Sequence, residues 1–125
     1  MKDIYENRQW HSSDINDYAN STIHYYLNST FLNLFESDIK NAIKQVKIPY
    51  QNGTGSGGSL ATGVNGLATK VFLLSGSEVG WTTSDDNYFQ KDGAKLDYFG
   101  SSSGGNSKRV AYLNGSATYW WLRSP

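Results

Sequence analysis

The stretch VAYLNGSATYWWLRSP, residues 110–125, predicts a β-hairpin more clearly than any other part of the chain. At its centre, Asn114-Gly115 is the preferred dipeptide of a two-residue type I′ turn, because both of its positions take positive φ. Strand-forming residues flank the turn on both sides, so the hairpin is expected over about residues 109–123. Its expected pairs are Leu113 with Ser116, Tyr112 with Ala117 and Val110 with Tyr119.

The closing strand of this hairpin carries bulky side chains in both directions. Alternation places Tyr119 and Trp121 on one face of the strand, and Trp120 and Leu122 on the other. A strand with large apolar groups on both faces belongs inside a layered core. Trp120 and Trp121 are therefore interpreted as core residues, with an aromatic ligand platform as the alternative.

The N-terminal half predicts two helices after an irregular start. Asn20 or Ser21 can cap a first helix over about residues 21–35, whose apolar stripe is Ile23, Leu27, Phe31, Leu34 and Phe35. Ser37 offers a second cap, and the spacing of Ile39 and Ile43 predicts a short helix over about residues 38–44.

The middle of the chain predicts loops around one buried strand. A short extended piece at residues 46–50 contains Pro49, and residues 51–69 are interpreted as a long loop because they are rich in Gly, Ser, Thr and Asn. KVFLLS at residues 70–75 is a nearly continuous apolar run, typical of a strand buried on both faces. A Gly/Ser run follows at residues 100–107. Together these elements predict the α+β class in one domain.

Charge and composition exclude several kinds of partner. The chain has 11 Lys plus Arg against 11 Asp plus Glu, so it lacks the surplus of cations that phosphate backbones require, and no nucleic acid partner is expected. It contains no apolar run long enough for membrane insertion and no targeting signal. Cysteine is absent, which removes thiolate nucleophiles and Cys-based zinc sites without fixing the compartment.

Polar and aromatic residues dominate the remaining composition. The chain holds 16 Ser, 13 Gly and 11 Asn beside 9 Tyr and 4 Trp. Adaptable small polar residues beside rigid aromatic anchors are typical of recognition surfaces. The same mixture is common in loop-rich β domains, so the composition leaves both interpretations open.

Candidate catalytic and metal motifs do not fit their required contexts. GTGSGG at residues 53–58 and GSSSG at residues 100–104 lack the flanking strand and helix that nucleotide or nucleophile sites need. His24 lies on a helix flank and is interpreted as a solvated surface residue. Calcium is the one metal considered, at Asp85, Asp86 and Asp92 beside Asn87, but that spacing lacks the loop pattern and glutamate of an EF-hand. No metal, cofactor or catalytic residue is predicted.

Four blocks in order resemble an uncharacterised bacterial and phage domain family that carries a WLRSP signature. The blocks are STIHYYLNSTFLNLF (21–35), SDIKNAI (37–43), KVFLLSGSE (70–78) and the signature itself, Trp120, Trp121, Leu122, Arg123, Ser124 and Pro125. Two features depart from the family pattern: His24 stands where Arg is common, and no Gly follows the signature.

The resemblance implies a C-type-lectin-like fold, shared with formylglycine-generating enzymes and phage receptor-binding proteins. It also implies further strands on both sides, so this segment is expected to lack N- and C-terminal strands and to self-associate through unpaired sheet edges. Arg123 is expected to be partly buried at the end of a strand and to need a fork-shaped acceptor. Glu78 and Glu36 are the candidates implied by a recurrent acidic position of the family.

These inferences predict a non-enzymatic recognition or display domain that binds carbohydrate or protein. It would be part of a larger extracellular, cell-surface or phage-virion protein. The alternatives are a structural spacer domain and an oxidase relic of the formylglycine-generating kind, against which the absence of cysteines argues. Exposed aromatics would be drawn from Tyr25 and the predicted binding set, which is Trp81, Asn87, Tyr112, Asn114 and Tyr119.

Overall fold

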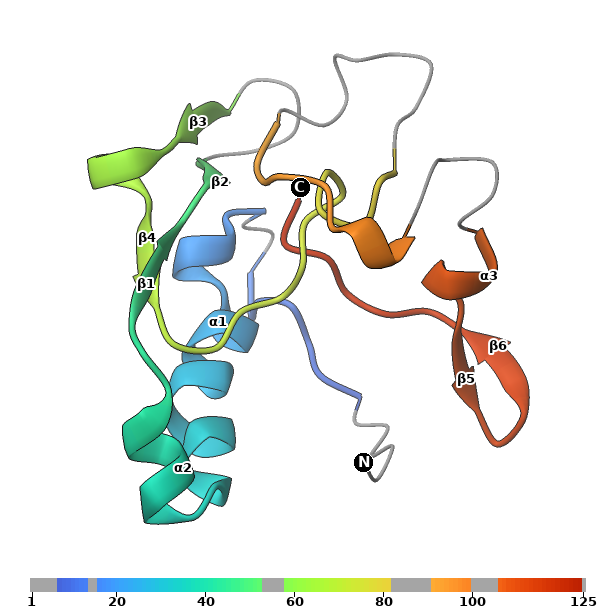
Figure 1. The fold of residues 1–125 in the computed structure, drawn as a ribbon, viewed down its shortest axis with the longest axis horizontal. Helices are drawn as coiled ribbons and strands as arrows, with labels where there is room; N and C mark the ends of the chain where they lie inside the picture. The colour runs from blue at the N-terminus through green and yellow to red at the C-terminus, as the bar shows by residue number, and fades with distance from the viewer. Residues whose placement is uncertain (1–6, 14–15, 53–57, 82–90, 100–105, 125) are drawn as a thin grey trace.

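Figure 1 shows a helical segment beside a narrow two-stranded ribbon, with a small hairpin projecting at the opposite side of the molecule. This computed structural model describes residues 7–13, 16–52, 58–81, 91–99 and 106–124. Helices and small antiparallel sheets alternate along these residues, so the predicted α+β class is confirmed.

The first helical segment has the predicted extent but not a uniform geometry. The Ser21 hydroxyl accepts a hydrogen bond from the His24 amide at 3.1 Å, which confirms Ser21 as the cap. After the short turn η1 (Tyr18–Asn20), the segment consists of α1 (Thr22–Tyr26), the π-helical turn η2 (Leu27–Phe31) and the 3₁₀ turn η3 (Leu32–Leu34).

The π turn changes which residues face the core. Ile23 is buried as predicted, but Leu32 is buried in place of Leu34, which is exposed. A π turn bonds residue i to i+5, so it adds a residue per turn and rotates everything that follows around the helix axis. Including Leu34 in the apolar stripe was therefore wrong.

Asn28 lies inside this π turn and joins the helix to residues 69–71. Its Nδ2 donates to the Val71 carbonyl at 2.8 Å and to the His24 carbonyl at 3.1 Å. Its Oδ1 accepts from the Thr69 hydroxyl and from the backbone amides of Lys70 and Val71 at 3.0–3.1 Å. One amide side chain thus fixes the helix against the start of the KVFLLS segment.

The second helix, α2 (Ser37–Ala42), begins one residue earlier than predicted and ends two residues earlier. Glu36 occupies its N-cap position and Ser37 is its first residue, without a side-chain capping bond. Ile39 is exposed and α2 buries no residue. The helix therefore contributes little to the core.

Short strands occupy the region predicted as a loop over residues 51–69. β1 (Val46–Ile48) pairs with β4 (Leu67–Thr69), and β2 (Tyr50–Asn52) pairs with β3 (Ser59–Ala61), both antiparallel. For the described residues the loop prediction was wrong. These three-residue strands are too short to show hydrophobic alternation, and they are held by backbone pairing together with core contacts of Ile48 and Leu67.

Residues 70–75 are largely half-buried but form no strand, contrary to the prediction. No neighbouring strand among the described residues pairs with them; side chains satisfy several of their backbone groups, and the Leu74 carbonyl accepts from the Arg123 backbone amide at 2.9 Å. The Leu73 amide donates to the Tyr18 hydroxyl at 3.0 Å, and the Leu73 carbonyl accepts from Arg123 at 2.8 Å. The apolar run therefore correctly predicted that the segment is largely covered, but its prediction of strand pairing was wrong.

The C-terminal hairpin is confirmed, although it is shorter than predicted. β5 (Ala111–Leu113) pairs with β6 (Ser116–Thr118) in the predicted register, and Asn114 and Gly115 take φ values of 50° and 81°. Two short helical turns precede it, η6 (Asp97–Phe99) and α3 (Asn106–Arg109).

Residues 119–121 leave the ladder, so the prediction of a buried two-sided strand was wrong. Tyr119 is 96% exposed, and Trp120 and Trp121 are also exposed. The hairpin projects away from the helix and the ribbon (Figure 1). Among the described residues, Trp120 bonds the Arg109 carbonyl and Trp121 lies against Trp10, so local contacts take the place of a covering sheet. The chain re-enters the interior only at Arg123.

The apolar core is small and lies between the helix and the ribbon. Tyr18, Ile23 and Ile48 form its buried cluster, and the partly buried side chains packed on it are Trp10, Leu67, Phe72 and Leu73. His24 is half-buried, its ring 5.0 Å from that of Tyr18, so its interpretation as a solvated residue was wrong. Burial lowers the pKa of His24 and raises the pKa of Tyr18 to about 12.

Replacing Asn28 with Ala is expected to lower the free energy of unfolding by about 2–4 kcal/mol, because it leaves several backbone groups unpaired. Urea unfolding followed by circular dichroism would measure this. Asn33→Ala is the matched control, since Asn33 is exposed and accepts only from the Lys40 ammonium at 3.2 Å. Equal losses in both variants would contradict the role assigned to Asn28.

Stability is expected to fall as the pH is lowered through the ordinary His24 pKa of 6.5. The pKa of His24 is lower in the folded chain, so the unfolded chain binds more protons in this range and is favoured by acid. Unfolding curves between about pH 8 and pH 5 would show the decline, and His24→Gln should flatten it. A decline of the same size in His24→Gln would assign it to other groups.

Candidate functional site

The largest fully buried side chain of the described residues is that of Arg123, whose residue is 1% exposed. Its Nη1 and Nη2 donate to the two carboxylate oxygens of Glu78 at 2.6 and 2.7 Å. The remaining donations go to the carbonyls of Pro49 at 3.1 Å, Leu73 at 2.8 Å and Asp92 at 2.6 Å. All five N–H groups of the side chain are therefore occupied.

The expected acidic partner of Arg123 is confirmed as Glu78 and not Glu36. Glu36 is exposed at the start of α2. Glu78 is held by Ser75, because the Ser75 amide donates to Oε2 and the Ser75 hydroxyl accepts from the Glu78 amide. A Cβ on Gly93 would lie 2.5 Å from the Glu78 side chain, so only glycine permits this approach.

Asp92 completes this cluster together with Ser124. The Ser124 hydroxyl donates to Asp92 Oδ2 at 2.7 Å and accepts from the Gly76 amide at 2.8 Å. We call Arg123, Glu78, Asp92 and Ser124 the polar centre. Asp92 is buried there, so it cannot serve the surface calcium site considered from the sequence.

The other predicted site residues divide between the surface and the undescribed part of the chain. Asp85, Asp86, Asn87 and Pro125 lie outside the described residues. Within the described ranges, no three acidic or histidine side chains come together to hold a metal ion. No helix in the same ranges has the length and apolar character needed to cross a membrane.

Exposed aromatic side chains gather around α3 at the end of the molecule opposite the helix. Tyr98 is 66% exposed, and the Lys108 ammonium lies 5.2 Å from its ring centre. The Trp120 indole N–H donates to the Arg109 carbonyl at 2.8 Å, and the Arg109 guanidinium donates to the Val79 carbonyl at 3.0 Å. Val79 lies two residues before Trp81, which is 52% exposed.

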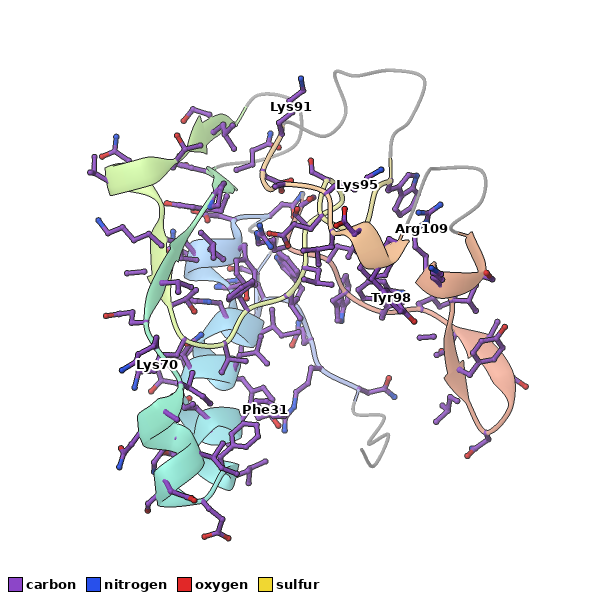
Figure 2. All side chains as sticks on the ribbon, in the orientation of Figure 1. Phe31, Lys70, Lys91, Lys95, Tyr98 and Arg109 are labelled. Carbon is purple, nitrogen blue, oxygen red and sulfur yellow. The ribbon has the colours of Figure 1, made fainter. Side chains whose placement is uncertain are left out.

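We define the α3 surface as Trp81, Tyr98, Lys108, Arg109 and Trp120. The hairpin beside it adds three of the predicted binding residues, which are Tyr112, Asn114 and Tyr119, all exposed. Figure 2 shows Tyr98 and Arg109 together on this side, far from Phe31 and Lys70. The sequence did not indicate Tyr98 or Lys108, because residues 76–107 show no regular pattern and Lys108 follows directly after the Gly/Ser run at residues 100–107.

Trp121 belongs to a different set of contacts. Its ring lies 5.5 Å from that of Trp10, and its indole N–H donates to the Arg8 carbonyl at 3.2 Å. Trp10 in turn lies 5.9 Å from Tyr18 in the core. Trp121 therefore anchors the N-terminal segment, although half of its surface stays exposed.

A shallow groove of about 440 Å³ also lies along the flank of α1. Its polar side chains are largely used within the fold: Ser21 caps α1, Ser29 bonds the Tyr25 carbonyl, and Asn28 bonds residues 69–71. It therefore offers fewer recognition groups than the α3 surface.

The fold and these sites define a small α+β domain with a structural polar centre and an exposed aromatic surface. The chain belongs to the family described as a domain of unknown function, DUF6273, whose model matches residues 1–125. No curated protein and no solved structure matches the chain. The family's WLRSP signature, phage origin and lectin-like fold stay predictions.

Replacing Arg123 with Lys is expected to lower the free energy of unfolding by about 3–5 kcal/mol, because one ammonium cannot replace five forked donors around a buried carboxylate. Glu78→Gln, which keeps the shape but removes the charge, should also be destabilised. Urea unfolding measures both. Arg8→Lys is the control, since Arg8 is exposed with its guanidinium 3.8 Å from the Tyr26 ring centre. Wild-type stability in Arg123→Lys would refute the role of the polar centre.

Proposed function

We propose that this protein is a non-enzymatic recognition domain that binds carbohydrate through the α3 surface and the adjoining hairpin. The observation that carries the proposal is the exposure of Trp81, Tyr98 and Tyr119 on segments that contact α3. Arg109 donates to the Val79 carbonyl, the Lys108 ammonium lies over the Tyr98 ring, and Trp120 donates to the Arg109 carbonyl. Large exposed aromatic groups contribute little to a core, and their accumulation in one place is typical of binding sites.

The rings of the α3 surface are held in place while they remain exposed. The Trp120 indole N–H donates to the Arg109 carbonyl. The rings of Tyr98 and the buried Phe99 form a T-shaped pair with their centroids 5.2 Å apart. A ring that is already positioned loses little conformational entropy when a ligand stacks on it. This preorganisation supports a role in binding.

The kind of side chain is suited to carbohydrate. Among the large hydrophobic side chains exposed from residue 81 onward in the described part, all but Leu96 and Val110 are Tyr or Trp. Flat rings with hydroxyl or indole edges suit the flat C–H face and polar rim of a sugar. A protein partner would also use Tyr and Trp, so protein binding is an outcome that the test must separate.

A second candidate, a structural spacer domain, is favoured by a different observation. Every donor of the Arg123 guanidinium is used within the fold, so this side chain holds segments together and has no N–H group left for a ligand. A spacer would need the polar centre but not the α3 surface.

The same proposal includes three further points. The scaffold is C-type-lectin-like, the chain self-associates through unpaired strand edges, and it is part of a larger bacterial-surface or phage-associated protein. Exposed aromatic residues on loops and a hairpin are the arrangement expected of such a display scaffold. The encoded neighbours of this chain and its oligomeric state in solution would test these points.

A glycan array probed with the whole chain is expected to identify retained sugars, and Tyr119→Ala or Trp81→Ala should weaken their binding about 5- to 20-fold. Tyr25→Ala is the matched control, because the exposure of Tyr25, 75%, lies between those of Trp81 and Tyr119, but Tyr25 lies on α1. Thermal unfolding would confirm that the three variants remain folded. Absence of any bound glycan, or an equal loss in Tyr25→Ala, would reject carbohydrate recognition at this surface.

A further inference from the structure

We infer that the ligand of the α3 surface is an acidic polysaccharide, whose sugar rings stack on the aromatic side chains and whose carboxylate or phosphate groups bind the neighbouring lysines. This inference rests on the proposed function and specifies the chemistry of its ligand. Its basis is the way charge is distributed around η6 and α3.

The chain is neutral as a whole, but its last part is not. Residues 91–125 contain five basic side chains and two acidic ones. One base, Arg123, and one acid, Asp92, are buried in the polar centre. The exposed acid is Asp97, whereas Lys91, Lys95 and Lys108 are all exposed and Arg109 is partly exposed.

The cations lie beside the exposed rings and not apart from them. The Lys108 ammonium is 5.2 Å from the centre of the Tyr98 ring. Lys95 comes just before η6, which carries Tyr98, and Figure 2 shows Lys95, Tyr98 and Arg109 on the same side of the molecule. A sugar stacked on Tyr98 would therefore bring an acidic substituent within reach of a lysine.

Charge complementarity favours an anionic sugar over a neutral one. A neutral sugar could use the aromatic faces but would leave several exposed cations without ligand contacts. An ammonium binds a carboxylate or a phosphate as a point charge, without strict geometry, which suits a flexible polymer with a repeated anionic group. The repeat also lets one chain engage Lys95 and Lys108 together.

Binding of the whole chain to polygalacturonate and to its fully methyl-esterified form would test the inference. The two polymers share a sugar backbone and differ in charge. We expect the acid form to bind at least about 10-fold more tightly, and raising the ionic strength from about 0.05 to about 0.5 M to remove most of that difference. A phosphomannan and its dephosphorylated form would show whether phosphate serves as well; a preference for either charged polymer supports the inference.

The variants identify the residues responsible. Lys95→Gln and Lys108→Gln should each weaken binding to the acid form about 5-fold and leave binding to the esterified form unchanged. Tyr98→Ala should weaken binding to both forms. Lys44→Gln is the matched control, since Lys44 is exposed just after α2, away from this surface, and this variant should bind as the parent does.

Three outcomes would overturn the inference, and they separate it from the proposed function. Equal binding of acid and esterified polymers would reject an acidic ligand but keep carbohydrate recognition. Equally tight binding of poly-L-glutamate would show that charge alone suffices, and would reject both. Binding to no charged or neutral glycan would reject the proposed function and this inference with it.

Discussion

The guanidinium of Arg123 forms hydrogen bonds to four segments that are far apart in the sequence and joins them in the fold. Its five donors reach the junction of β1 and β2 at Pro49, the extended segment at Leu73, the turn at Glu78 and the loop at Asp92. The described residues contain only two-stranded sheets, which are marginally stable by themselves. Burying this charge is costly, and only a complete set of partners makes it favourable.

The α3 surface is positioned by the same cluster. The Glu78 carbonyl accepts from the Leu96 amide at 2.9 Å, which places η6 and therefore Tyr98. One residue further, the Val79 carbonyl accepts from Arg109, whose own carbonyl holds Trp120. The segment that carries Glu78 thus links the buried ion pair to the α3 surface through three hydrogen bonds to backbone carbonyls, two of them donated by side chains. Displacement of Glu78 would be transmitted to both ends of that surface.

Local rules were sufficient where one residue type meets one backbone requirement. Asn114-Gly115 fixed the hairpin and its register, and Ser21 capped α1, because turn and cap chemistry depend on neighbouring residues alone. Arg123 was expected to be partly buried at the end of a strand, whereas it is 1% exposed and β6 ends at Thr118; Glu78 was one of two candidates implied by the family resemblance. The polar centre was therefore predictable in part, whereas its backbone partners come from distant loops that no spacing reveals.

Other features depend on tertiary context that the sequence pattern does not contain. Large side chains on both faces of the strand predicted that Trp120 would be buried, but Trp120 is exposed. The alternation of residues along a strand does not tell whether a given aromatic side chain is buried or exposed. The run at residues 70–75 predicted a ladder, but the Tyr18 hydroxyl and the Asn28 amide replaced the neighbouring strand.

The net charge of zero likewise does not show how charge is distributed over the surface. Because Glu78 and Asp92 turn inward to complete the polar centre, the lysines on either side of Asp92 stay outside, and a neutral chain acquires a locally cationic face.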